Sequence, residues 1–124
     1  MITLHHLDQS RSFRILWALE ELELDYQVQF YQRLPTFAAP PELKLVHPLA
    51  KAPVLTDDEQ TIAESAVILQ YLQESYDVPQ QFKPQHKAEQ QQYRYWLHYA
   101  EGSLMPLLVM QLVMNNVPKH VPWL

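Results

Sequence analysis

The sequence contains no cysteine and a single glycine, Gly102, beside ten prolines. Without thiols the chain can form no disulfide, no cysteine-ligated zinc site and no thiol nucleophile or redox pair. With one glycine it cannot build phosphate-binding loops of the G-x-G-x-x-G or Walker type, so nucleotide-binding enzymes that use those loops are excluded. The lack of cysteine gives no evidence for an oxidising compartment, and we expect a cytoplasmic protein.

Basic residues and long apolar runs are also scarce. Nine basic residues stand against 14 acidic ones, a net charge of −5, which disfavours binding to nucleic-acid phosphates. No apolar run approaches the roughly 20 residues of a membrane-spanning helix, and residues 1–6 show neither a basic leader nor an apolar signal core. The apolar fraction of 48% is typical of a folded domain. We therefore expect a soluble protein that binds neither nucleic acid nor a membrane.

Hydrophobic periodicity predicts alternating strands and helices over the first 75 residues. A helix between the first two strands implies that they run parallel, whereas the polar turn at 57–59 implies an antiparallel hairpin. The order βαβαββα predicts an α/β layer fold with a mixed sheet. The expected strands are 2–6, 27–31, 52–56 and 60–63; the expected helices are 11–23, a short one after 40–41 that ends before 47–48, and one from 64–65 to about 75 that buries Val67, Ile68, Tyr71 and Leu72.

A proline-containing stretch after residue 76 predicts a linker. We place one domain at 1–78, the linker at 79–85 and a helical segment at 86–124. The long helix of that segment should be bent or split at Pro106. Its apolar residues between 104 and 113 lie nearly all around the helix, a pattern that requires burial on several sides.

Three motifs carry a resemblance to a known family. They are QSRSFRILW at 9–17, HPLAKAPVL at 47–55 and IAESAVI at 62–68. In this order and spacing they make the sequence resemble the cytosolic glutathione transferases, most specifically over residues 1–75, with the serine-type bacterial and fungal branch nearest. The resemblance implies a thioredoxin-like glutathione-binding domain followed by the start of an all-helical domain, of which only the first helix or helix pair is present.

The resemblance also implies an activity. The chain would conjugate the glutathione thiolate to a small hydrophobic electrophile, as in detoxification, with glutathione as co-substrate, no cofactor and a homodimeric assembly. The alternative is a non-catalytic glutathione-transferase-like binding or assembly module, because a fold alone does not determine a function.

Ser10 is the first candidate for the catalytic group. It lies between a strand and a helix start, where backbone N–H groups and the helix dipole favour an anion. Its hydroxyl would donate a hydrogen bond to the thiolate rather than act as a nucleophile. Ser12 is the competing candidate, Arg11 adds a favourable positive charge, and the alternative reading is that Ser10 only caps the helix.

The resemblance places the glutathione site around a proline turn. Pro53 would be a cis-proline that presents the backbone of Val54 to the cysteinyl part of glutathione, in strand-like pairing; a trans edge-strand proline is the alternative. Ser65 and the N–H groups at its helix start would hold the γ-glutamyl carboxylate, and Glu64 would accept from the γ-glutamyl ammonium group. An ordinary helix cap is the alternative for this pair.

Two further expectations concern the surroundings of this site. Lys51 would bind the glycyl carboxylate, with Arg33 a weaker candidate. Ala50 stands where the family usually has glycine or a polar residue, so the loop should be slightly rearranged.

We expect no metal site, because the adjacent residues His5 and His6 point to opposite faces of a strand and the other histidines are scattered.

Overall fold

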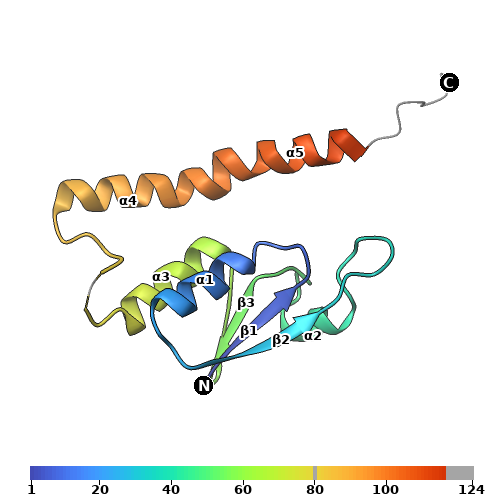
Figure 1. Cartoon of the computed structure of the whole chain (residues 1–124), viewed down its shortest axis with the longest axis horizontal. Helices are drawn as coiled ribbons and strands as arrows, with labels where there is room; N and C mark the ends of the chain where they lie inside the picture. The colour runs from blue at the N-terminus through green and yellow to red at the C-terminus, as the bar shows by residue number, and fades with distance from the viewer. Residues whose placement is uncertain (80, 117–124) are drawn as a thin grey trace. The chain divides into compact units, whose positions relative to one another are not determined.

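A computed structural model of the chain describes residues 1–79 and 81–116 (Figure 1). The chain forms two compact units, Met1–Lys83 and the part from Pro84 onward, and each is described by itself. The first unit ends inside the segment expected to be a linker.

The first unit is built on a four-stranded sheet in the order β2-β1-β3-β4 (Figure 1). Strand β1 pairs in parallel with β2, and it pairs antiparallel with β3, which forms a hairpin with β4. The predicted mixed sheet of a thioredoxin-like domain is confirmed. The strands are β1 (Ile2–Leu7), β2 (Tyr26–Tyr31), β3 (Val54–Asp57) and β4 (Gln60–Ala63).

Two helices, α1 (Phe13–Glu21) and α3 (Ser65–Tyr76), bury apolar side chains against the sheet. The short α2 (Glu42–Val46) lies between β2 and β3 in the chain and buries Leu43 completely. Residues four apart in a helix point to the same side. Each helix therefore buries a pair with this spacing, Ile15 and Leu19 in α1 and Ile68 and Leu72 in α3. The core cluster consists of Ile2, Leu4, Ile15, Leu19, Leu55, Ile68 and Leu72.

The predicted buried face of α3 is wrong at one residue. Val67 is 50% exposed, whereas Ile68 and Leu72 are fully buried. Successive residues of a helix are about 100° apart around its axis. Val67 is therefore rotated by about 100° from Ile68, and by more from Leu72, so its side chain faces solvent. Sequence periodicity identified the apolar residues but not the centre of the buried stripe.

Strand β3 extends one residue further than predicted and begins two residues later. Pro53 precedes the strand, and Asp57 belongs to it and pairs with Gln60. The hairpin turn therefore contains only Asp58 and Glu59, and the positive φ of Asp58, 50°, is typical of a two-residue hairpin turn.

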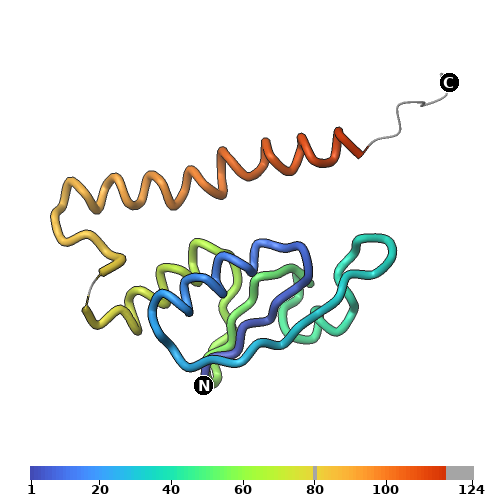
Figure 2. Tube along the Cα trace, in the orientation of Figure 1, coloured from blue at the N-terminus to red at the C-terminus, as the bar shows by residue number. Residues whose placement is uncertain are grey.

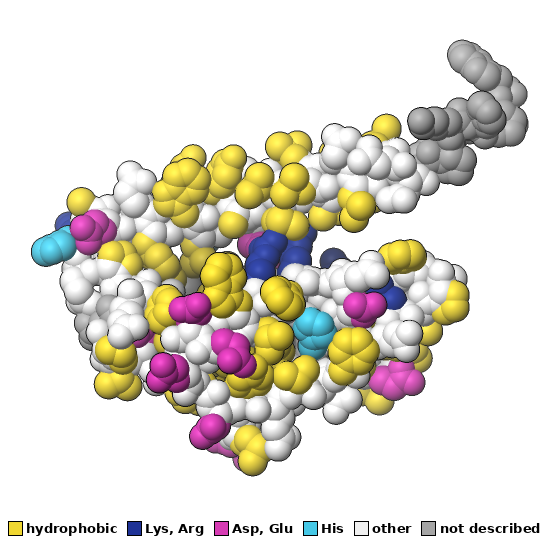
Figure 3. Space-filling view, in the orientation of Figure 1, with side chains coloured by type: hydrophobic (Ala, Val, Ile, Leu, Met, Phe, Trp, Pro, Cys, Tyr) yellow, Lys and Arg dark blue, Asp and Glu magenta, His cyan; other side chains and the backbone are white. Residues whose placement is uncertain are grey.

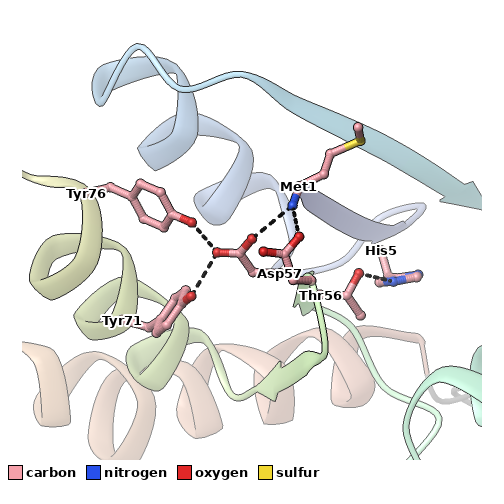
Figure 4. Close-up of polar contacts among 7 residues, drawn as sticks. Met1, His5, Thr56, Asp57, Tyr71 and Tyr76 are labelled. Carbon is pink, nitrogen blue, oxygen red and sulfur yellow. Dashed lines mark hydrogen bonds and ion pairs between the residues drawn. The ribbon is translucent and has the colours of Figure 1, made fainter.

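Asp57 connects the end of β3 to helix α3 (Figure 4). It is 7% exposed, and its carboxylate accepts hydrogen bonds from the hydroxyl of Tyr71, at 2.8 Å, and from that of Tyr76. The amino group of Met1 contacts Asp57 as well, at 3.4 Å. The hydrogen bond from Tyr76 is the main reason that the pKa of Asp57 lies below its ordinary value. A charge-assisted network thus replaces apolar packing at this end of the core.

The second unit is a single helical segment in which no loop separates the successive helices (Figure 2). Helix α4 (Lys87–Tyr99) leads into a π-helical turn, η1 (Ala100–Leu104), and then into α5 (Met105–Asn116). Pro106 interrupts the α-helical pattern as predicted, because proline lacks an N–H group and its ring clashes with the carbonyl four residues back. The interruption is a wide turn, in which the N–H of Met105 donates to the carbonyl of Ala100.

Apolar side chains are exposed along α5, as Figure 3 shows for the face in view. Leu107, Leu112 and Met114 are each more than 60% exposed. No helix in the described part of the chain is long and apolar enough to cross a membrane.

Candidate functional site

The loop between β1 and α1 brings two serine hydroxyls together. The Oγ atoms of Ser10 and Ser12 are 2.6 Å apart, and the backbone N–H of Ser12 donates to Ser10 Oγ at 3.2 Å. Ser12 stands at the N-cap position of α1, but its φ and ψ are already helical and its side chain makes no cap hydrogen bond. The hydroxyl of Ser12 is turned towards β1 instead of capping the helix.

The two serines differ in exposure. Ser12 is fully buried, and its Oγ lies 2.9 Å from Nδ1 of His6 and 3.4 Å from the carbonyl oxygen of Leu7. Ser10 is half-buried. Only Ser10 has a surface that a ligand can reach without rearrangement of the loop.

The peptide bond between Ala52 and Pro53 is cis, as the resemblance implied. Pro53 and Val54 are buried, and Val54 pairs with His5 on one side and Ala63 on the other. Strand β3 therefore has no free edge at Val54. The residue of this turn that lines the adjacent cavity is Ala52, which the sequence analysis did not single out.

A cavity of about 410 Å³ lies beside the cis-proline turn, a volume within the range of small-ligand sites. It brings together five residues that the sequence analysis named as candidates, from four separate segments, whereas Ser10, Ser12, Pro53 and Val54 are not among its lining. Its charged and hydroxyl-bearing lining residues are Arg11, Arg33, Lys51, Glu64 and Ser65.

Glu64 and Ser65 begin helix α3 at the wall of this cavity. Glu64 has φ 72° and ψ 122°, its side chain forms no cap, and it is exposed. A residue other than glycine with this backbone conformation costs about 1–3 kcal/mol, and such strain is concentrated at functional sites. Ser65 is almost fully buried. The reading of Glu64 as an ordinary side-chain cap is thus not supported.

Arg33 connects the two loops that flank the cavity. Its Nε donates to the carbonyl of Asp8 at 2.9 Å, its Nη1 to that of Phe37 at 2.7 Å and its Nη2 to that of Gln9 at 3.3 Å. The guanidinium therefore braces the β1–α1 loop against the segment that follows β2. A single sequence contains no signal for this role, because the acceptors are backbone carbonyls up to 25 residues away.

The adjacent histidines lie on opposite faces of β1. His5 contacts the hydroxyl of Tyr31 through Nδ1 at 3.0 Å and that of Thr56 through Nε2 at 3.2 Å. Burial lowers the pKa of His5 below its ordinary value, whereas His6 contacts Ser12. Among the described residues, no three side chains of His, Cys, Asp or Glu gather as metal ligands would.

The strand order, the cis-proline and the cavity beside it define a thioredoxin-like domain. Residues 1–74 match the family model described as glutathione S-transferase, N-terminal domain. The chain belongs to the glutathione S-transferase family.

Two curated relatives extend this likeness through the helical part. The chain is 43% identical over 124 aligned residues to glutathione S-transferase 3 of Schizosaccharomyces pombe, which covers 95% of this chain and 50% of the relative. It is 38% identical over 123 residues to glutathione S-transferase 1 of Saccharomyces cerevisiae, covering 94% of this chain and 53% of the relative. The chain thus spans about half the length of the curated relatives that it matches.

Solved structures agree with the fold. A glutathione S-transferase from Actinobacillus pleuropneumoniae has a TM-score of 0.85 and 44% identity, covering 94% of this chain and 55% of its own. Ure2p in complex with glutathione has a TM-score of 0.80 and 25% identity, covering 96% of this chain and 56% of its own.

Proposed function

We propose that the chain binds glutathione in the cavity beside Pro53 and that Ser10 stabilises the glutathione thiolate. The observation that carries this proposal is the convergence of Lys51, Glu64 and Ser65 on one cavity next to the cis-proline turn. The family membership and the glutathione complex of the similar protein Ure2p support the choice of ligand.

Each end of glutathione has a chemical partner in the cavity. The hydroxyl of Ser65 and the N–H groups at the start of α3 bind the γ-glutamyl carboxylate, and the carboxylate of Glu64 accepts from the γ-glutamyl ammonium group. Lys51, which is exposed at the cavity rim, binds the glycyl carboxylate. The backbone beside Pro53 pairs with the cysteinyl part, through Ala52 rather than through the buried Val54.

Ser10 acts on the thiol by hydrogen bonding. A thiol of this kind has a pKa of about 8.5, and lowering it by two units means favouring the thiolate by about 2.7 kcal/mol. A hydroxyl donor, the start of α1 and the positive charge of Arg11 together are sufficient for a shift of this size. In the complete, cytoplasmic, dimeric protein the thiolate sulfur then forms a bond to the electrophilic atom of a small apolar substrate. The electron pair of the bond that breaks at that atom departs with the displaced group or, where an activated double bond is attacked, moves to the neighbouring atom, which takes up a proton.

A second candidate function is glutathione binding without catalysis. The observation that favours it is the similarity to Ure2p, whose structure was solved in complex with glutathione. Thiolate formation separates the two functions, because a binding module does not need an ionised thiol.

Calorimetric titration with glutathione tests the proposed site. Glu64→Ala and Ser65→Ala should each weaken binding by at least about tenfold, which is 1.4 kcal/mol, because each removes a partner of the γ-glutamyl end. Glu59→Ala is the matched control, since Glu59 is an exposed acidic residue in the β3–β4 turn and does not line the cavity. Unchanged affinity in both site variants would refute the assignment.

A further inference from the structure

The hydroxyl of Ser10 is one end of a chain of hydrogen bonds that leads to His6. Ser12 Oγ lies in the middle, 2.6 Å from Ser10 Oγ and 2.9 Å from Nδ1 of His6. The ring of His6 is stacked on that of Phe30, with centroids 5.7 Å apart, which orients the imidazole from the neighbouring strand. The imidazole of His6 is therefore coupled to the proposed thiolate donor through one fully buried hydroxyl.

A serine hydroxyl has one proton, so if Ser12 uses its proton in one of its two shorter contacts, with Ser10 or with His6, this series of hydrogen bonds can run in only two directions. In the first, Nδ1 of His6 is unprotonated and accepts the proton of Ser12. Ser12 Oγ can then make its short contact with Ser10 only as an acceptor, and Ser10 donates to it. In this direction the proton of Ser10 is used inside the loop and is not available to a thiolate.

In the second direction, Nδ1 of His6 carries a proton and donates to Ser12 Oγ. Ser12 then donates to Ser10 Oγ, which also accepts the backbone N–H of Ser12 at 3.2 Å. The other acceptor within reach of the Ser12 hydroxyl, the carbonyl of Leu7, is farther away at 3.4 Å. Ser10 thus receives two hydrogen bonds, and its own proton is left for a ligand.

We propose that His6 is a positioning residue: it carries a proton on Nδ1 and, through Ser12, directs the hydroxyl of Ser10 towards the thiolate. Consecutive hydrogen bonds of the same direction strengthen one another, so Ser10 also becomes a better donor. This inference rests on the proposed function. It gives a reason why a buried serine hydroxyl at the N-cap position of α1 is turned towards β1 instead of capping the helix.

Nitrogen-15 NMR of the histidine rings in the protein without glutathione shows whether Nδ1 of His6 carries a proton, and therefore in which direction the hydrogen bonds run. The signals of His6 are identified by their loss in His6→Asn. A protonated Nδ1, in the neutral or the charged ring, is the expected result, and an unprotonated Nδ1 near neutral pH would overturn the inference. Because the measurement needs no glutathione, its outcome is independent of whether the proposed function is correct.

The thiolate absorbance of bound glutathione supplies a second readout. His6→Leu removes the ring donor and should lower the ratio of thiolate to thiol about threefold, with glutathione affinity unchanged. His6→Asn should restore most of that ratio, because its amide can donate from near the position of Nδ1. His5→Asn is the matched control on the opposite face of β1 and should leave the ratio at the wild-type value. An undiminished ratio in His6→Leu would contradict the relay.

Discussion

Among residues 1–79 and 81–116, six residues other than glycine have a positive φ, and the only glycine of the sequence does not. Gly102 lies in the π-helical turn, where a Cβ would meet nothing within 4 Å. Residues with a Cβ atom thus adopt the left-handed backbone conformation, which is strained for them. Three of the six, Phe37, Ala50 and Glu64, line the proposed glutathione cavity. The six are Gln9, Glu23, Phe37, Ala50, Asp58 and Glu64.

Ala50 is the residue at which this strain is most easily relieved. Its φ is 48°, a conformation that costs alanine roughly 1 kcal/mol and glycine little. Ala50→Gly should therefore raise the free energy of unfolding by about 0.5 kcal/mol, the relief of strain exceeding the added chain entropy. Denaturant unfolding measures the change. Ala18→Gly in helix α1 is the control and should destabilise by about 1 kcal/mol; a similar loss in Ala50→Gly would contradict the conformational argument.

Among secondary-structure elements, sequence periodicity predicted the order and type of all seven in the first unit. Apolar spacing suffices for this, because a strand or a helix must bury a periodic face. It failed where polar contacts set the boundary: Asp57 extends β3 because two tyrosine hydroxyls of α3 bind it, and α1 starts at Phe13 while Ser12 turns towards His6.

The candidate site could be predicted only where a motif names its residues. Lys51, Glu64 and Ser65 were expected from the resemblance, and all three line one cavity. The brace formed by Arg33 and the placement of Ala52 could not be predicted, because they depend on backbone carbonyls and on which side of the cis-proline turn faces the cavity.

His5 should make the β1–β3 pairing sensitive to acid. Burial lowers its pKa from the ordinary value of 6.5, so the unfolded chain binds a proton more readily than the folded one. The contribution of His5 to stability is therefore complete above pH 6.5 and is lost as the pH falls below that value towards the folded-state pKa.

Urea unfolding between pH 7 and pH 5 tests this sensitivity. The free energy of unfolding should fall more steeply with decreasing pH in the wild type than in His5→Gln, which keeps a hydrogen-bonding group but cannot titrate. His98→Gln, an exposed histidine of α4, should keep the wild-type slope. Parallel pH curves for wild type and His5→Gln would show that His5 is not the acid-sensitive group.

At the scale of the whole molecule, the exposed apolar side chains of α5 determine how the chain behaves in solution. At about 25 cal/mol per Å², a few hundred Å² of uncovered apolar surface forfeits several kcal/mol. The 124 residues by themselves should therefore unfold easily and self-associate. A chimaera that continues α5 with the part of the Schizosaccharomyces pombe relative that lies outside the aligned half should be several kcal/mol more stable.

Thermal unfolding and light scattering on the two proteins make this comparison. Leu112→Gln, at an exposed position of α5, should reduce self-association of the short chain and destabilise only the chimaera. Equal stability and equal association of the short chain and the chimaera would mean that α5 needs no cover.

The pH titration of bound glutathione measures whether Ser10 stabilises the glutathione thiolate, as we propose. Thiolate formation requires no electrophile pocket, so the ultraviolet absorbance of the thiolate can be followed against pH on these 124 residues. The bound thiol should titrate about two pH units below the free value of about 8.5. Ser10→Ala should return it towards that value with glutathione affinity nearly unchanged. The same thiol pKa in wild type and Ser10→Ala would contradict the claim.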